Sequence, residues 1–535
     1  MVTYNVILHK GVDYQSFWDD MENENDGGNL YIPNRTVDSP NQRLNSQRQT
    51  WYTLSEEEAE NVRNDERVFV VEIPPENRDD IIIGHHATQA GTFTKTTSDS
   101  GNYQNWGLIR ALSKDNIYGT STTTSEIYTY TLTGKGVDVV TQDSGMQTDH
   151  PEWVDRFESV DWGSYGAFTQ NANHDRDFDG HGSHCAGIAV GKTFGFAKGS
   201  KVFNQKISGL EGSGDSGTGI SPSFAFDAIK GWHNAKPIDT ITGYKRPTVV
   251  NMSWGYLSLG KDSEFTNITY RGASSSGGDI DTAGERETNF GLMSNPYDVN
   301  GGNIRYAINN RISSIDTDIE ELLDAGVHIC VAAGNRSNKT DEVGGDDYNN
   351  TYSIGSGNKF YHRGSSPYGD AAMDGSQRAI IVGNIDSSVS SGTLDRKATS
   401  SETGPGVDIY AAGTNIMSST STTNRWGGGS QNYTLNTNFK QTNITGTSMA
   451  SPQVAGVLAC ILELHPEFTP AQGKQWLLDN AGSAILNTGT GNDWANDRSL
   501  KGGEAKVLHM PFSNPTPIKV SGGIAMNFNI GIKER

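Results

Sequence analysis

Apolar residues in the first part of the chain recur at spacings that predict a small mixed domain. Four of them at positions i, i+3, i+4 and i+7 predict an amphipathic helix capped by Asp13, namely Tyr14, Phe17, Trp18 and Met21. A capping-box pattern, Ser55 with Glu58, opens a second predicted helix. Extended apolar stretches at 4–9, 51–54 and 68–73 alternate with the two helices. Residues 1–78 are therefore expected to form a small α+β domain of the ferredoxin-like type.

The pattern changes beyond a polar stretch at residues 79–104. This stretch is rich in Thr, Ser, Gly and Asp, which is typical of an exposed linker that proteases cut readily. Residues 105–510 then carry short β-branched apolar runs that alternate with helical patterns, and the runs lie at 137–140, 248–252, 328–332 and 379–382. This alternation predicts an α/β domain with a mostly parallel sheet sandwiched by helices.

Three polar segments interrupt the α/β pattern, and each is expected to be a surface insertion. They lie near residues 256–303, 336–376 and 418–443. Residues 511–535 form a C-terminal extension in which apolar residues alternate with others. Two interpretations of this extension stay open, an extra strand and a docking segment.

The composition is that of an ordinary globular protein, with 34% hydrophobic residues and 63 glycines among 535 residues. No run of about 18 uncharged apolar residues is present, so a membrane is not an expected partner. The formal net charge of −21 makes nucleic acid an unfavourable partner as well, because the average surface repels a phosphate backbone.

The three cysteines, Cys185, Cys330 and Cys460, are too few for a disulfide framework and are expected to be free, buried thiols. The first residues lack a basic region followed by an apolar stretch, so no secretory signal is visible. Three locations of the protein stay open as interpretations: the cytoplasm, a virion, and the outside of the cell after export by another route.

Three short segments each hold one residue that acyl-transfer chemistry requires. Asp143 ends an apolar strand, where α/β sheets place functional groups, although Asp143 alone would read as a turn residue. His181 stands between glycines at the start of an apolar helix. Ser448 lies at the head of another apolar helix, where the free amides favour a developing negative charge.

The chain order Asp, His, Ser is that of the subtilisin arrangement rather than the chymotrypsin or α/β-hydrolase arrangements. The stretches around Asp143, His181 and Ser448 resemble the three signature motifs of the subtilases, and the most specific is Gly-Thr-Ser-Met-Ala-Ser-Pro at 446–452. Segments 105–110 and 150–153 look most like the proteinase K branch. The resemblance covers about residues 100–510, apart from the insertions.

This resemblance implies a serine endopeptidase that cleaves peptide or protein substrates through an acyl-enzyme intermediate. Ser448 would be the nucleophile, His181 the general base and Asp143 the residue that orients the imidazole. The segment Val-Ala-Ala-Gly-Asn at 331–335 resembles the family's oxyanion segment. The Asn335 side chain and the Ser448 backbone amide would then stabilise the oxyanion.

Two segments are expected to pair with the substrate backbone by β-augmentation. One consists of Ser253, Trp254 and Gly255, and the other consists of Gly212, Ser213 and Gly214. Three small residues would form one wall of the primary specificity pocket, namely Ala332, Ala333 and Gly334. Such a wall predicts room for an apolar or aromatic side chain.

Two kinds of acidic pattern in the sequence resemble metal sites. The run Asp175-x-Asp177-x-Asp179 opens like an EF-hand loop, but position 12 is Ala186 rather than Glu, so that interpretation fails. Acidic patches at 316–321 and 341–347 are expected to be solvated faces. The chemistry requires no cofactor. Structural calcium, which subtilases often carry, is left possible with its ligands unknown.

Residues 1–78 look like the inhibitory propeptide that accompanies secreted subtilases, which makes the chain's own propeptide a partner. The segment near 80–100 is expected to lie in the active site, and self-cleavage is expected between Thr92 and Asn105. The alternatives are a subtilase-fold protein whose blocked cleft serves binding or assembly, and a non-peptidase acyl hydrolase. The presence of Asp143, His181, Asn335 and Ser448 together favours the peptidase.

Overall fold

A computed structural model describes most of the chain. The residues outside the description are 10, 23–31, 33–34, 42–48, 74–86, 91–92, 95–104, 117–122, 125–126, 167, 295–298, 301–302, 355–357, 372, 374, 376–377, 387–393, 490–497 and 512–535. The described chain divides into two compact units, an amino-terminal unit within residues 1–84 and a large unit within 85–516. The C-terminal extension and most of the predicted linker fall outside the described residues.

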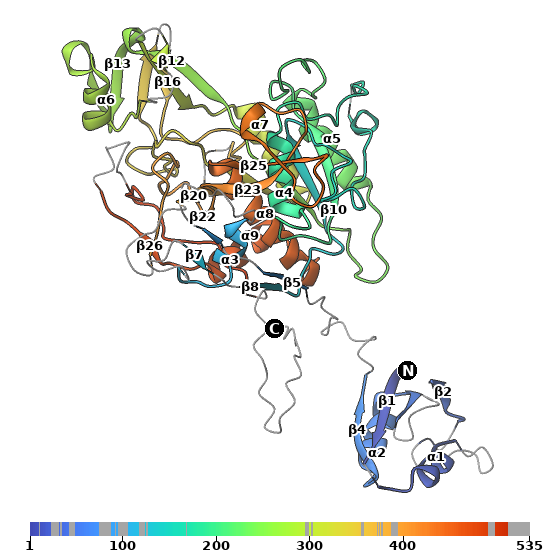
Figure 1. Cartoon of the computed structure of the whole chain (residues 1–535). Helices are drawn as coiled ribbons and strands as arrows, with labels where there is room; N and C mark the ends of the chain where they lie inside the picture. The colour runs from blue at the N-terminus through green and yellow to red at the C-terminus, as the bar shows by residue number, and fades with distance from the viewer. Residues whose placement is uncertain are drawn as a thin grey trace. The chain divides into compact units, whose positions relative to one another are not determined.

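The amino-terminal unit, blue in Figure 1, is a four-stranded antiparallel sheet with two helices. Its elements are β1 (Val2–Leu8), α1 (Tyr14–Glu22), β2 (Asp38–Asn41), β3 (Gln49–Leu54), α2 (Glu56–Arg63) and β4 (Val68–Glu72). The strand order β2-β3-β1-β4 is the ferredoxin-like order, as predicted. Strand β2 was not predicted, because its sequence is polar and contains Pro40, which a sheet tolerates at an edge.

Local sequence signals account for the helices of this unit. The Ser55 hydroxyl accepts a hydrogen bond from the Glu58 amide at 3.2 Å, and the Glu58 carboxylate accepts one from the Ser55 amide at 2.7 Å. This reciprocal capping box starts α2 as the sequence predicts. Helix α1 buries Phe17 and Met21 in the core of the unit.

The large unit is built on a six-stranded sheet in the order β10-β9-β11-β17-β20-β22. Every neighbouring pair in this sheet is parallel. The strands are β9 (Asp138–Asp143), β10 (Lys201–Lys206), β11 (Thr248–Met252), β17 (Val327–Ala332), β20 (Ile380–Ile385) and β22 (Ile409–Ala412). Four of them contain the predicted apolar runs, whereas β10 and β22 were not predicted.

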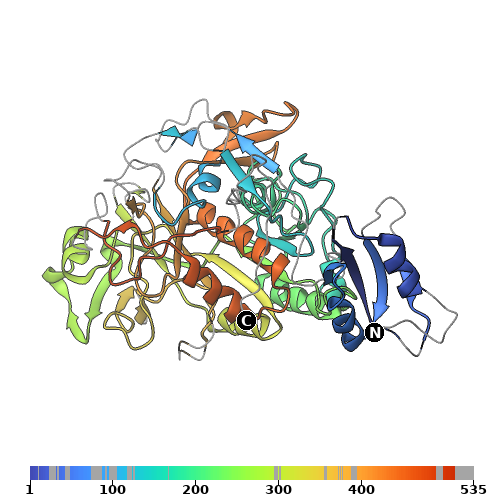
Figure 2. The same ribbon diagram turned by 90° about the horizontal axis from the view of Figure 1, so that it is seen from below.

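Helices flank this sheet. They are α3 (Trp106–Arg110), α4 (His181–Val190), α5 (Pro222–Ala235), α7 (Ser313–Asp324), α8 (Thr447–Leu464) and α9 (Pro470–Asn480). Every residue of β9, β11 and β20 is buried, which requires cover on both faces of the sheet. Helix α8 packs along β11, β17 and β20, and Figure 2 shows it in orange beside the yellow strand β17. The predicted α/β class is confirmed.

Helix α8 is also long and apolar enough to cross a membrane, by length and composition. The helix contains Glu463, and 83% of its apolar window is buried inside the large unit. It therefore serves as the central core helix of this unit.

The segments near 256–303 and 336–376 pack together into a satellite lobe with its own apolar core, seen at the upper left in Figure 1. Strand β13 pairs with β18 and so joins the two segments. The elements are β12 (Leu257–Lys261), β13 (Phe265–Tyr270), β14 (Ala273–Ser275), α6 (Ala283–Phe290), β15 (Val299–Asn300), β16 (Asn303–Asn309), β18 (Thr351–Ile354) and β19 (Asn358–Phe360).

The segment near 418–443 differs from the expected surface loop. It contributes to a three-stranded sheet of β23 (Ile416–Thr420), β24 (Gln431–Asn432) and β25 (Lys440–Ile444), and all of β23 is buried. The hydroxyls of Ser418, Ser419 and Thr420 donate hydrogen bonds to backbone carbonyls of 180–184, in and just before α4. For these residues the surface prediction is wrong, because a hydroxyl-rich strand can be buried when a helix supplies acceptors.

The remaining strands form small two-stranded sheets. These pairs are β5 (Ala87–Ala90) with β8 (Ile127–Tyr130), β6 (Phe93–Thr94) with β7 (Thr123–Thr124), and β21 (Asp395–Arg396) with β26 (Ile485–Leu486). Tyr128 of β8 packs against Phe196. The Cys460 thiol, near the carboxyl end of α8, also donates to the Phe196 carbonyl. Ser448 lies at the opposite end of α8, so the structure contradicts the expectation that this part of 80–100 lies in the active site.

Candidate active site

Three of the predicted residues lie at or just beyond one edge of the parallel sheet. Asp143 is the last residue of β9, Ser253 follows β11, and Asn335 lies three residues after β17. Because these strands are parallel neighbours, their carboxyl ends meet at the same edge. His181 and Ser448 enter the same region from the first turns of α4 and α8.

Asp143 and His181 form a hydrogen-bonded pair. His181 Nδ1 lies 2.8 Å from Asp143 Oδ1, and the same oxygen accepts the Ser144 amide at 2.7 Å. Gly182 permits the close approach of α4 to the end of β9, since a Cβ there would lie 2.1 Å from the Gly145 carbonyl oxygen. The geometry suits an imidazole that keeps its proton on Nδ1 and offers Nε2 to a second group.

The environment of this pair acts on the His181 pKa in two opposite directions. Burial lowers the pKa, but the charge and hydrogen bond of Asp143 outweigh it, so the pKa of His181 is raised well above its usual value. The imidazole therefore binds a proton more strongly than a free histidine does. This is the property that a general base at this position needs.

Asp177 supports the first turn of α4, a role that the sequence interpretation missed. Its carboxylate accepts hydrogen bonds from the Gly180 amide at 2.7 Å, the Ser183 amide at 2.9 Å and the Ser144 hydroxyl at 2.9 Å. Burial raises the pKa of Asp177, and these bonds oppose that effect. The available signal was an aspartate shortly before a predicted helix, which is a position for a helix cap rather than for a calcium ligand.

Ser448 lies in the first turn of α8 and is half-buried. Its hydroxyl donates to the Ser253 carbonyl at 3.1 Å, and the Ser253 hydroxyl donates to the Ser448 carbonyl at 2.9 Å. Asn251 in turn donates to the Ser253 hydroxyl at 2.9 Å. These bonds hold the start of α8 against the end of β11. No hydrogen bond joins the Ser448 hydroxyl to His181 among the described contacts.

The Asn335 amide is oriented by Thr447, the residue before Ser448. Asn335 Oδ1 accepts hydrogen bonds from the Thr447 amide at 2.8 Å and from the Thr447 hydroxyl at 3.1 Å. With its oxygen engaged, Asn335 has its NH₂ group left to donate to a ligand. Thr447 was not predicted, although it stands inside the specific 446–452 segment.

A cleft of about 120 Å³ lies beside Ser448. Its lining residues are Ser253, Trp254, Gly255, Leu257, Asn309, Ala332, Gly334, Asn335, Arg336, Ser365, Thr447 and Ser448. Among the predicted pocket residues, Ala332 and Gly334 line the cleft, whereas Ala333 is buried and does not line it. The structure therefore brings both the proposed nucleophile and Asn335 to one concave site.

The predicted segment Gly212, Ser213 and Gly214 does not line this cleft. Gly212 lies against the backbone of Phe178 and Asp179, where a Cβ would come within 2.3 Å of the Asp179 amide nitrogen. Ser213 and Gly214 are exposed. This places the segment beside the residues that lead into His181.

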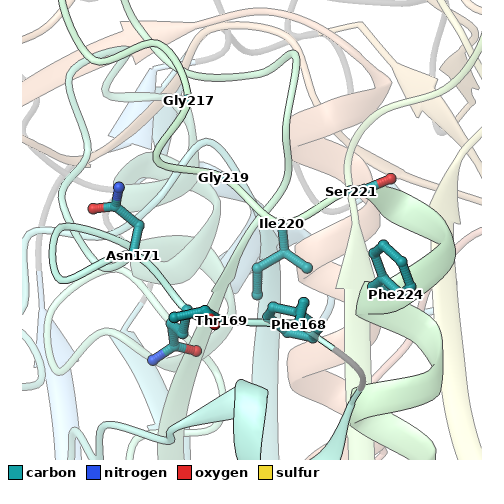
Figure 3. Close-up of a pocket in the computed structure, with 9 residues that line it drawn as sticks. Phe168, Thr169, Asn171, Gly217, Gly219, Ile220, Ser221 and Phe224 are labelled. Atoms are coloured by element: carbon teal, nitrogen blue, oxygen red, sulfur yellow. The ribbon is translucent and has the colours of Figure 1, made fainter.

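A larger cavity, of about 430 Å³, has no part in the acid–base chemistry (Figure 3). Its lining residues are Phe168, Thr169, Gln170, Asn171, Gly217, Gly219, Ile220, Ser221 and Phe224, none of which titrates. The rings of Phe168 and Phe224 lie 5.9 Å apart on one side of it. The smaller cleft is the better candidate for the chemical site, because Ser448 and Asn335 line it.

All three cysteines are free and buried, as predicted. Cys185 Sγ lies 3.8 Å from His181 Nδ1, and the ligand atoms of Asp143, His181 and Cys185 all lie within 4.8 Å of one another. Burial raises the pKa of Cys185, so its thiol keeps its proton. Since Nδ1 and Oδ1 are already bonded to each other, this arrangement fits a hydrogen-bonded pair better than a metal site.

Several residues of the acidic patches are paired within the protein. Asp316 accepts hydrogen bonds from Ser366, Tyr368 and Gly369 and pairs with Arg311. Asp347 pairs with Arg271 and Lys339, and Asp341 pairs with Lys339. Both patches therefore contain buried ion pairs as well as solvated carboxylates. Structural calcium stays a prediction without assigned ligands.

Comparison with known proteins places the chain among the subtilisin-like proteins. It is 28% identical over 428 residues to subtilisin-like serine protease Pen c 2 of Penicillium citrinum, which covers 78% of this chain and 68% of the relative. It is 27% identical over 438 residues to alkaline protease 2 of Aspergillus fumigatus, which covers 79% and 64%. The chain matches from about half to two thirds of the length of its curated relatives.

A solved structure described as a cold adapted subtilisin-like serine proteinase aligns with a TM-score of 0.45 and 20% identity, over 76% of this chain and 99% of that one. The comparisons do not single out the proteinase K branch, which stays a prediction. The model of the subtilase family, peptidase S8, matches residues 134–504, more than half of the chain. The chain belongs to the subtilase family.

Proposed function

We propose that the protein is a serine endopeptidase in which Asp143, His181 and Ser448 form the catalytic triad. The observation that carries this proposal is the Asp143–His181 hydrogen bond of 2.8 Å, at the sheet edge where Ser448 and Asn335 line one cleft. Family membership supports the same activity.

In the proposed acylation step, Ser448 Oγ attacks the carbonyl carbon of the scissile peptide bond while His181 Nε2 takes the hydroxyl proton. Asp143 holds the Nδ1 proton and stabilises the imidazolium. The C–N bond then breaks, and His181 gives its proton to the leaving amine. Water, deprotonated by His181, hydrolyses the acyl ester and regenerates the Ser448 hydroxyl.

The oxyanion of each tetrahedral intermediate would be bound by the Asn335 NH₂ group and the Ser448 backbone amide. Thr447 supports this role, because its two hydrogen bonds to Asn335 Oδ1 set the amide before substrate arrives. Donors held in place in advance typically contribute about 100- to 1,000-fold to turnover each.

The Ser448 hydroxyl must turn before it can react. In the structure it donates to the Ser253 carbonyl, so this hydrogen bond must break before the hydroxyl proton can pass to His181 Nε2. Catalytic hydrogen bonds of this kind often form only when substrate is bound.

Peptide or protein substrates are proposed to pair with the two predicted substrate segments, 253–255 and 212–214. Within the described chain, the amides of Trp254 and Gly255 have no backbone partner, and neither do those of Ser213 and Gly214. Unpaired amides are what an extended peptide needs for pairing by β-augmentation. Residues 1–78 are proposed as a propeptide, released by cleavage between Thr92 and Asn105.

An active-site probe tests the proposal. A fluorophosphonate is expected to label the protein covalently at Ser448, and Ser448→Ala is expected to abolish the labelling. The control is Ser216→Ala, which should keep full labelling because Ser216 lies in an exposed turn. Processed protein that is not labelled and cleaves no peptide would favour the alternative of a blocked cleft that serves binding or assembly.

A further inference from the structure

The cleft beside Ser448 contains one charged residue, Arg336. All the other residues that line it are uncharged, and several of them are polar: Ser253, Asn309, Asn335, Ser365, Thr447 and Ser448. Arg336 immediately follows Asn335, so its position relative to the proposed oxyanion site is set by the chain itself. The cleft thus combines small apolar walls with a guanidinium group.

The hydrogen-bonding capacity of Arg336 is mostly unused. Its Nη1 donates to the Asn335 carbonyl at 3.3 Å, and its Nε is buried without a partner. In the part of the chain that the structure describes, no carboxylate lies within ion-pair distance of this guanidinium. A guanidinium has five N–H donors in a fixed planar fork, so most of them remain free for a ligand.

The carboxyl group of Glu402, which contacts the Arg336 backbone, does not neutralise the Arg336 guanidinium. Glu402 accepts the Arg336 backbone amide at 3.1 Å, and its side chain lies behind Gly334, where a Cβ would come 2.8 Å from Glu402 Cγ. Burial raises the pKa of Glu402 to about 8, which favours its protonated, uncharged form. The cleft therefore keeps the positive charge of the guanidinium.

Two uncharged groups add polarity to the same cleft. Asn309, at the end of β16, lies next to Gly334, where a Cβ would be 3.2 Å from its Nδ2. The Ser365 hydroxyl donates to the Tyr256 carbonyl at 2.8 Å, which leaves its oxygen lone pairs toward other groups. An apolar or aromatic side chain in this cleft would desolvate these groups and Arg336 without replacing their bonds to water.

We infer that the cleft selects substrates with an aspartate or glutamate at the residue whose carbonyl is attacked, through an ion pair with Arg336. This inference rests on the proposed endopeptidase function, since it assigns the cleft beside Ser448 to that residue. It replaces the expectation of an apolar or aromatic preference. Guanidinium and carboxylate form paired, charge-assisted hydrogen bonds, which are stronger and more selective than neutral ones.

The test uses the full chain and four peptide substrates that differ only at the attacked residue: Glu, Gln, Phe and Lys. At pH 7, kcat/KM for the Glu peptide is expected to exceed that for the Gln peptide by about 10- to 100-fold, the range of a hydrogen bond to a charged group. The Lys peptide is expected to be the poorest. Raising the salt concentration should reduce the preference only partly, because the cleft is partly buried.

Three variants and a control localise the preference. Arg336→Gln should bring the Glu-to-Gln ratio close to one, Arg336→Lys should keep part of it, and Arg336→Glu should favour the Lys peptide. The control Lys192→Gln removes one exposed cation that pairs with Asp155 on the surface, and it should keep the full ratio. It separates the local charge from the net charge of the protein.

Fluorophosphonate labelling distinguishes the two possible failures. If Ser448 is labelled and the Phe peptide is cleaved best, the inference about Arg336 is overturned while the proposed function stands. If Ser448 is not labelled and no peptide is cleaved, the proposed function fails and the inference fails with it. A Glu preference that survives in Arg336→Gln would also overturn the assignment.

Discussion

The pKa of His181 is controlled by two effects of opposite sign, burial and the neighbouring Asp143. Burial disfavours the imidazolium, and Asp143 at 2.8 Å favours it more strongly, so the pKa is raised. A general base works only while it is neutral. The acidic limb of the activity profile should therefore follow the raised pKa of this one residue.

For the wild type, kcat/KM is expected to fall as the pH drops, with its midpoint above pH 6.5. In Asp143→Asn the carboxylate is lost while burial remains, so the midpoint should move below the wild-type value and kcat should drop by about 10⁴-fold. The measurement is kcat/KM for one peptide across pH 5 to 10. The exposed Asp149 provides a matched control, because Asp149→Asn removes the same charge and should leave the limb in place. An acidic limb at or below pH 6.5 in the wild type would contradict the assignment.

Helix α4 depends on a cap from outside the helix. Its first residue is preceded by Gly180 with a φ of 89°, a conformation that favours glycine, and Gly180 has no side chain with which to cap. Asp177 supplies the missing acceptor for the amides of Gly180 and Ser183. The position of His181 thus relies on a carboxylate four residues away.

Asp177→Ala is expected to lower the free energy of unfolding of the large unit by about 2 to 4 kcal/mol, because three buried donors lose their acceptor. Asp177→Asn, which keeps one acceptor oxygen, should cost less. Denaturant unfolding of the Ser448→Ala background, which prevents self-digestion, measures both. The exposed Asp115 is the control, and Asp115→Ala should leave the midpoint nearly unchanged. An equally small effect in Asp177→Ala would rule out the capping role.

The loop that carries Gly212 is held by a buried ionic network. Asp215 pairs with Lys206 and with Arg176, and the side chains of Asp215 and Lys206 are fully buried. Lys206 also donates to the Arg176 carbonyl at 2.7 Å, and the Asp215 amide donates to the Gly212 carbonyl at 3.0 Å. One network therefore links the end of β10, the residues before His181 and the predicted substrate segment.

Removing one partner of this network should destabilise the protein more than removing two. Asp215→Ala leaves the Lys206 ammonium buried without a counter-ion, at an expected cost of about 3 to 5 kcal/mol in unfolding free energy. The double variant Lys206→Met/Asp215→Leu should recover most of this loss. Burial raises the pKa of Asp215, but the hydrogen bonds of Lys206 and Arg176 outweigh it, so the pKa is lowered.

Because the folded-state pKa of Asp215 is lowered, its stabilising contribution is present at neutral pH and is lost as the pH falls through that value. Denaturation midpoints at pH 7 and at pH 3 provide the measurement. Asp215→Ala should lose less stability relative to the wild type at the lower pH. Equal losses for the single and double variants would show that the ionic network does not explain the effect.

Two compact units in one chain are consistent with a precursor. Active protein is expected to begin between Thr92 and Asn105, since self-cleavage would release residues 1–78 with their linker. The measurement is amino-terminal sequencing of the active form, with the Ser448→Ala variant as its control. That variant should keep Met1 and run as the full-length chain, and an active form that also starts at Met1 would contradict the processing proposal.

Local patterns in the sequence were sufficient for the elements that hold the chemistry. Strands β9, β11, β17 and β20 were predicted because each has a run of β-branched residues bounded by turn residues. The capping box of α2 could also be predicted from the sequence, because both of its residues lie within one helical turn. The order of Asp143, His181 and Ser448 along the chain, together with the motifs around them, indicates the family without any knowledge of their contacts.

Strand β10 shows why other elements were missed. Asn204, Gln205 and Lys206 are polar yet buried in the sheet. Gln205 donates to the Ala225 carbonyl, and Lys206 pairs with Asp215. A polar strand can be buried only if distant residues satisfy its groups, and no local pattern reveals those partners. The buried β23 was misjudged for the same reason.

The positive charge of Arg336 in the cleft is another feature that the sequence did not predict. Arg336 follows a predicted oxyanion residue, but its neighbours along the chain do not show that it lines the cleft or that it lacks a counter-ion. Propensity and spacing act over a few residues and so can be read from the sequence. Electrostatic pairing and the lining of a cleft depend on side chains that only folding brings within a few ångströms. These two features are therefore known only from the tertiary structure.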